Sequence, residues 1–120
     1  MIPSRIVVVL GPHRSGTSVV AGLLHASGLP MGGPRTFVPR PSEQNPRGFF
    51  EDVRFRALND LALAANGYRV KEWGTEIERP RAPGGWSAAA RALLRSRAWS
   101  QARFGWKDPR QNLTHHLWMA

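Results

Sequence analysis

A short apolar run that leads into a glycine-rich turn constrains the fold of this chain more than any other feature. Residues 5–10, RIVVVL, are rich in β-branched side chains, and residues 11–18 read GPHRSGTS. Continuous apolar runs of this length are typical of strands buried on both faces of a parallel sheet. We therefore expect a central strand over residues 5–10, followed by a tight turn at its carboxyl end.

A helix is expected to begin at about Gly16 and to end at Gly28 and Pro30, which disfavour its continuation. The apolar side chains that recur at helical spacing, and that we expect to face the sheet, are Val19, Val20, Leu23 and Leu24. Residues 30–48 hold many glycine and proline residues and predict a long loop. Loops of this length are uncommon in a small domain and are often functional.

The rest of the chain predicts helices over residues 51–65, 87–102 and 113–119, a strand over 104–107 and a turn-rich segment over 67–86. The helix expected over 51–65 has an apolar stripe made of Val53, Leu58, Leu61, Ala62 and Ala65. Two further apolar residues, Phe55 and Leu63, lie off this stripe. Ser87 is the expected N-cap of the helix over 87–102, because its hydroxyl can accept from a first-turn N–H group.

This order of elements predicts an α/β fold, a three-layer P-loop-type parallel sheet with flanking helices. A chain of 120 residues fits one domain, and we assign residues 1–120 to it. Two strands are few for a parallel sheet. We therefore expect the chain to be the truncated, N-terminal part of a larger domain.

Composition excludes several kinds of site and location. The chain has no cysteine, so it can form neither a disulfide nor a thiolate metal site. It has no apolar run long enough for a transmembrane helix and no secretory leader pattern, and we expect a cytoplasmic protein. The net charge of +9 favours anionic partners. No nucleic-acid-binding module matches the sequence, so we expect no nucleic acid among them.

The turn at residues 11–18 has the chemistry of a phosphate-binding loop. Gly11 and Gly16 have the spacing of a P-loop, and the turn stands between a predicted strand and a predicted helix. In ATPases and kinases a lysine follows the second glycine, where this chain has Thr17. The cation of this loop is instead Arg14. The pattern therefore favours a loop that grips one terminal phosphate over a site for a nucleoside triphosphate with Mg²⁺.

Three segments together resemble the bacterial P-loop sulfotransferase family, whose members use 3′-phosphoadenosine 5′-phosphosulfate (PAPS) as sulfuryl donor. They are GPHRSGTS at 11–18, NPRGFFE at 45–51 and WKDPR at 106–110, and they occur in the order found in the family. The resemblance implies that the chain moves a sulfuryl group from PAPS to a hydroxyl or amine, without a metal. The acceptor stays open among small molecules, glycans, lipids and peptide tyrosines, and the oligomeric state is not indicated.

The resemblance also implies roles for individual residues. The 5′-phosphosulfate would be held by the loop residues Gly11, His13, Arg14, Ser15, Gly16, Thr17 and Ser18. Arg14 would stabilise charge on the bridging oxygen and cannot donate a proton, because the pKa of arginine stays above about 12. Glu51 is the candidate base, although a histidine serves in some relatives. The histidines that compete for this role are His13, His25, His115 and His116.

Lys107 and Arg110 are expected to contact the donor or the acceptor. They follow the predicted strand over 104–107, and ligands of open α/β sheets bind at the carboxyl ends of strands. A structural ion pair between Asp108 and Arg110 is the alternative. Asp108 would also be the only acidic strand end available to a kinase-like or nucleotide-hydrolysing domain.

The part of the donor site that binds the 3′-phosphate is not found in the sequence. Relatives supply it from an arginine and a serine on a later strand and helix, and residues 1–120 contain no such pattern. The resemblance therefore places only the 5′ half of the donor site in this chain. A P-loop kinase or NTPase and a non-catalytic anion-binding remnant stay open as alternatives.

Overall fold

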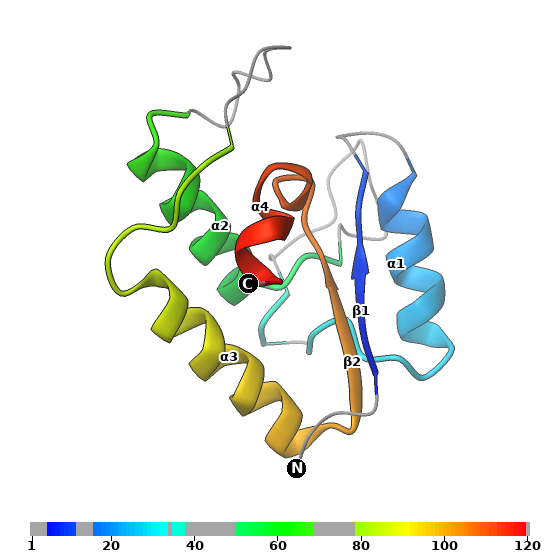
Figure 1. The fold of residues 1–120 in the computed structure, drawn as a ribbon. Coiled ribbons are helices and arrows are strands. Elements are labelled where there is room, and N and C mark those ends of the chain that lie inside the picture. The colour runs from blue at the N-terminus through cyan, green and yellow to red at the C-terminus, as the bar shows by residue number, and fades with distance from the viewer. Residues whose placement is uncertain (1–4, 12–15, 34, 38–49, 69–78, 120) are drawn as a thin grey trace.

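Two parallel strands form the centre of the fold, with β1 (Arg5–Val9) paired along its length with β2 (Arg103–Lys107). Arg5 lies opposite Arg103, and Val9 lies opposite Lys107. The computed structural model describes residues 5–11, 16–33, 35–37, 50–68 and 79–119 (Figure 1). Both strands run in the same direction, so Leu10 and Gly11 after β1 and residues 108–110 after β2 lie at the same end of the pair.

Four helices surround the strands in the order expected from the sequence, α1 (Thr17–Ala26), α2 (Val53–Ala65), α3 (Trp86–Ser100) and α4 (Gln111–Trp118). Asp52 caps α2, because its carboxylate accepts from the N–H group of Arg54, and α2 begins two residues later than expected. The predicted cap at Ser87 is wrong. Gly85 precedes α3 with a φ of 80°, and the helix begins at Trp86.

Helices cover both faces of the strand pair. Figure 1 shows α1 on one side of β1 and β2, and α2, α3 and α4 on the other. On the α1 side, Val9, Ala21 and Met31 form a buried apolar cluster. On the opposite side, Phe104 and Trp106 of β2 pack with Phe55 of α2. The α/β class is confirmed as a small parallel sheet with helices.

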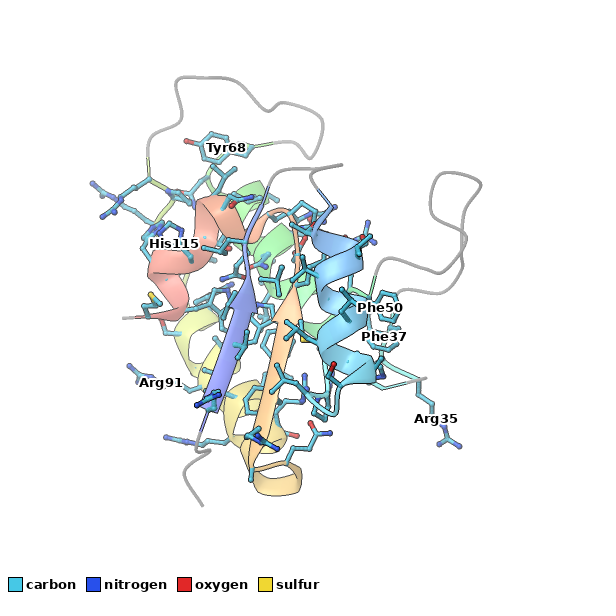
Figure 2. The ribbon with its side chains drawn as sticks, turned by 90° about the vertical axis from the view of Figure 1, so that its right-hand side faces the viewer. Arg35, Phe37, Phe50, Tyr68, Arg91 and His115 are labelled. Carbon is cyan, nitrogen blue, oxygen red and sulfur yellow. The ribbon has the colours of Figure 1, made fainter. Side chains whose placement is uncertain are left out.

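Phe37 and Phe50 complete the packing beside α1. Their rings meet edge to face with centroids 5.6 Å apart, as Figure 2 shows next to α1. Both contact the His25 ring, whose Nδ1 accepts a hydrogen bond from the N–H group of Met31. His25 is therefore a packed side chain that fixes the chain after α1.

The predicted sheet-facing row of α1 is wrong in three of its four members. Val19 and Leu23 are 66% and 64% exposed, and Val20 is also exposed. The buried positions are Thr17 and Ala21, whose small side chains let the helix approach the strands closely. Leu24 is partly buried against the cluster around Ala21.

The predicted stripe of α2 is also wrong at several positions. Phe55 and Leu63, which the stripe omits, are buried, whereas Leu61 is 55% exposed. The buried face of α2 includes Asn59, a polar residue that an apolar stripe cannot contain. None of the helices in the described ranges is both long and apolar enough to cross a membrane.

Candidate functional site

Lys107 contacts residues of the two other motifs identified in the sequence, at 11–18 and 45–51. Its ammonium group, at the end of β2, donates to Ser18 Oγ at 3.1 Å and to Glu51 Oε1 at 3.0 Å. Ser18 is the last residue of the phosphate-loop motif and lies in the first turn of α1. Lys107 is 3% exposed. A buried lysine therefore connects the start of α1, the end of β2 and the residue before the cap of α2.

Glu51 lies between two cations. One carboxylate oxygen pairs with Lys107, and the other lies 3.9 Å from Arg56 Nη1 on the first turn of α2. Glu51 is 6% exposed, so these contacts offset the cost of removing a carboxylate from water. To act as a base, Glu51 would have to accept the proton on one of these two carboxylate oxygens, each of which faces a cation.

The first turn of α1 faces the same end of the strands. Gly16 precedes the helix with a φ of 87°, a left-handed conformation that suits glycine. No side chain among the described residues caps this helix, and an uncapped helix N-terminus favours an anion, although the N–H group of Val19 already donates to the carbonyl oxygen of Gly16. Thr17 is buried and Gly11 is half-buried. The predicted site residues His13, Arg14 and Ser15 lie outside the described residues.

Asp108 and Arg110 form the structural ion pair that the sequence left as an alternative. Arg110 Nη1 lies 2.8 Å from Asp108 Oδ1, and both side chains are buried. Burial acts to lower the pKa of Arg110, but Asp108, Asp60 and Glu51 outweigh it and raise that pKa. The Arg110 guanidinium forms ion pairs with both Asp108 and Asp60. Contact between Arg110 and a ligand stays a prediction.

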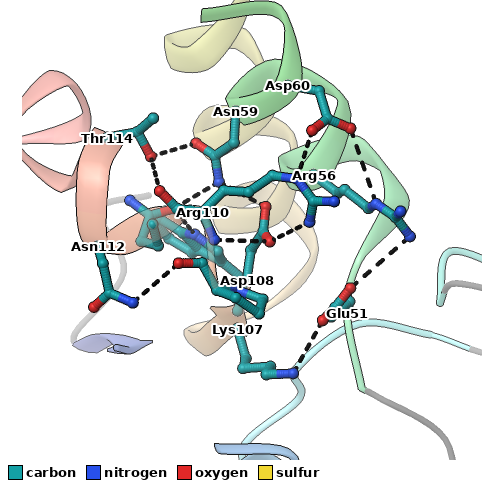
Figure 3. A network of polar contacts seen from close by, with 12 residues as sticks. Glu51, Arg56, Asn59, Asp60, Lys107, Asp108, Arg110, Asn112 and Thr114 are labelled. Atoms are coloured by element: carbon teal, nitrogen blue, oxygen red, sulfur yellow. Dashed lines mark hydrogen bonds and ion pairs between the residues drawn. The ribbon is translucent and has the colours of Figure 1, made fainter. Parts of the chain in front are cut away.

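A buried polar network beneath the strand end was missed by sequence reasoning (Figure 3). Asn59 Nδ2 donates to Asp108 Oδ2 at 3.0 Å and to Gln111 Oε1 at 2.9 Å. Asn59 Oδ1 accepts from Thr114 Oγ1 at 2.7 Å and from Trp118 Nε1 at 2.8 Å. The one available signal was a polar residue in the middle of an otherwise apolar helix face. This network fixes Asp108, and with it the direction in which the chain leaves β2.

The histidines described have structural contacts of their own. His115 Nδ1 lies 3.1 Å from the carbonyl oxygen of Asn112, and His116 Nε2 lies 2.9 Å from that of Pro80. Within the described ranges, no cluster of three or more histidine or carboxylate side chains could hold a metal ion. Among the groups described, Glu51 is the candidate base that lies next to Lys107.

The geometry thus brings together Ser18, Glu51 and Lys107 from three segments of the chain, and beside them it places Asp108 and Arg110 as a buried pair. Comparisons of the chain with protein-family models, with curated proteins and with solved structures find no match.

Proposed function

We propose that this chain carries the 5′-phosphosulfate part of a PAPS-dependent sulfotransferase site. The contact of Lys107 with both Ser18 and Glu51 carries the proposal. It joins the three motifs that resemble the family, although they are far apart in the sequence. A cation, a helix N-terminus and a carboxylate at one strand end are the groups that group transfer to a hydroxyl or amine requires.

Each group has a distinct part in the reaction. The loop N–H groups and the hydroxyls of Thr17 and Ser18 hold the phosphosulfate, and Lys107 and Arg14 stabilise its negative charge. The acceptor oxygen or nitrogen attacks sulfur while the bond from sulfur to the bridging oxygen breaks. Glu51 takes the acceptor's proton, and adenosine 3′,5′-bisphosphate leaves with the electron pair of the broken bond. The acceptor stays open among small molecules, glycans, lipids and peptide tyrosines, and a cytoplasmic location stays a prediction.

Kinase-like or nucleotide-hydrolysing chemistry is the second candidate function, and the contacts of Asp108 argue against it. A metal-dependent site would need this carboxylate to hold Mg²⁺. Asp108 Oδ1 accepts from the N–H group and Nη1 of Arg110, and Oδ2 accepts from Asn59. The carboxylate is 1% exposed. Three of its about four acceptor positions are therefore used inside the protein, which favours metal-free sulfuryl transfer.

Calorimetric titration separates the candidates. We expect adenosine 3′,5′-bisphosphate to bind the chain without Mg²⁺, and Lys107→Gln to weaken that binding by at least tenfold. Arg91→Gln is the matched control, because Arg91 is an exposed residue of α3 (Figure 2). Binding of ATP that requires Mg²⁺, with no response to the bisphosphate, would support the second candidate. Binding of neither ligand would leave a non-catalytic module and contradict the proposal.

A further inference from the structure

A basic cavity lies where the start of α2 meets the end of α3. It has a volume of about 190 Å³ and is lined by Gly32, Gly33 and Thr36, by the start of α2 and by the end of α3. Arg54, Arg97 and Gln101 contribute the charged and amide groups of its wall. None of these residues belongs to the three motifs that support the proposed function.

The charges around this cavity do not balance. Asp52 is the carboxylate that contacts both arginines, with Oδ1 accepting from Arg54 Nε and Oδ2 accepting from Arg54 Nη2 and Arg97 Nη1. Asp52 Oδ1 also accepts the N–H group of Arg54. A carboxylate offers about four acceptor positions. Asp52 is therefore saturated, and its single charge is shared by two guanidinium groups.

Donor groups remain on two of the side chains that line the cavity. Asp52 occupies Nε and Nη2 of Arg54, and no contact of Nη1 is found among the described residues. The Gln101 carbonyl oxygen accepts from Arg97 Nε, which orients the carboxamide and leaves its NH₂ group as the remaining donor. Donors from two helices thus meet at one cavity, in the way that carboxylate and tetrahedral oxyanion sites are built.

The environment of Arg97 also favours an additional anion. Arg97 is 4% exposed and lies over the Phe104 ring at 4.6 Å. Burial lowers the pKa of Arg97, Asp52 works against this, and the neighbouring Arg54 lowers the pKa further. A negative ligand in the cavity would offset that cost for the charged form.

We infer that the cavity lined by Arg54, Arg97 and Gln101 binds a small oxyanion, a carboxylate or a sulfate- or phosphate-like group. It is separate from the Lys107 site, since Asp52 turns toward α3 whereas its neighbour Glu51 turns toward β2. The inference does not depend on the reaction proposed for that site. The cavity accepts either a free anion or an anionic group of a larger ligand.

Amide NMR spectra of the chain test this inference with sulfate, phosphate and acetate as probes. Each probe is titrated at constant ionic strength, with chloride as the balancing anion. We expect saturable shifts at the amides of Gly33, Thr36 and Gln101. Stronger binding of sulfate and phosphate assigns a tetrahedral oxyanion, and stronger binding of acetate assigns a carboxylate. In the same spectra, the amides of residues 16–18 report anion binding at the phosphate loop. Binding at the cavity and binding at the loop are therefore tested independently.

Two variants and one control make the test specific. Arg54→Gln removes the excess charge and should weaken the cavity's affinity for the preferred probe by at least tenfold. Gln101→Ala removes the second donor and serves in its place if Arg54→Gln does not fold. Arg91→Gln, on the exposed side of α3, should leave the affinity unchanged. Shifts confined to residues 16–18, shifts that do not saturate, or equal losses in Arg91→Gln and Arg54→Gln would overturn the inference.

Discussion

The Lys107 ammonium lies 3.0 Å from the Glu51 carboxylate, across 56 residues of sequence. Both side chains are almost fully buried, so the contact also holds the segment before α2 against β2. An ion pair of this kind is costly to break, because removal of one partner leaves an uncompensated charge inside the protein.

Lys107→Met should therefore lower the free energy of unfolding by about 3–5 kcal/mol, measured by urea denaturation. The double variant Lys107→Met/Glu51→Gln should recover much of this loss, because neither charge is then buried alone. Binding of adenosine 3′,5′-bisphosphate should stay weak in both variants. Restored binding in the double variant would contradict a direct role of Lys107 at the anion.

Arg14→Ala should reduce the rate of sulfuryl transfer by about 10²–10³-fold, the usual effect of removing one group that stabilises developing charge. Thermal unfolding should be unchanged, because a loop cation that serves the ligand contributes little to the core. Arg14→Lys is the control that keeps the positive charge. An unfolded Arg14→Ala variant with full turnover per folded molecule would disprove the assigned role.

Asn59→Ala should destabilise the fold by at least about 3 kcal/mol, because it leaves several buried partners without a hydrogen bond, each at a cost of about 1–3 kcal/mol. The orphaned groups belong to Asp108, Thr114 and Trp118. Asn112→Ala is the matched control, since Asn112 makes one partly buried contact with the carbonyl oxygen of Pro109. Equal denaturation midpoints for the two variants would contradict a structural role of the network.

Gly105→Ala should disrupt the pairing of the strands. A Cβ atom at this position would collide with the carbonyl oxygen of Val7 and would lie 2.9 Å from Met31 Sδ. Overpacking of this kind costs about 1–3 kcal/mol, and here the obstacle is backbone, which yields less than a side chain. Gly84→Ala is the control, because nothing lies within 4 Å of a Cβ there. Thermal denaturation should separate the two variants by several degrees.

The order of the elements was predictable because it rests on local signals. The β-branched run at 5–10, the glycine-rich turn after it and the helix stop at Gly28 and Pro30 are each read from neighbouring residues. Helix faces were less predictable, because burial depends on what lies opposite. Ala21 of α1 is buried whereas Val19 is exposed, although valine is the more apolar residue. Small residues are buried there because the helix lies close to the strands.

The candidate site was likewise predictable only in part. Ser18, Glu51 and Lys107 were predicted from motifs, and the structure brings them together. Their mutual contact could not be predicted from the sequence, because it depends on how the long segment between them folds. Asn59 was missed for a different reason. A polar residue in a helix usually faces solvent, and only the partners on α4 and β2 make its burial favourable.

The aromatic packing beneath α4 also gives the protein a spectroscopic signature. The Trp118 ring lies 5.1 Å from Trp86 and 5.1 Å from Trp106, in different relative orientations. Indole transitions at such separations couple, so far-ultraviolet circular dichroism should contain paired bands of opposite sign that arise from tertiary contact rather than from helices. This signal comes from three separate segments of the chain. Its loss would report the separation of α4 from the rest of the fold even where helical content is unchanged.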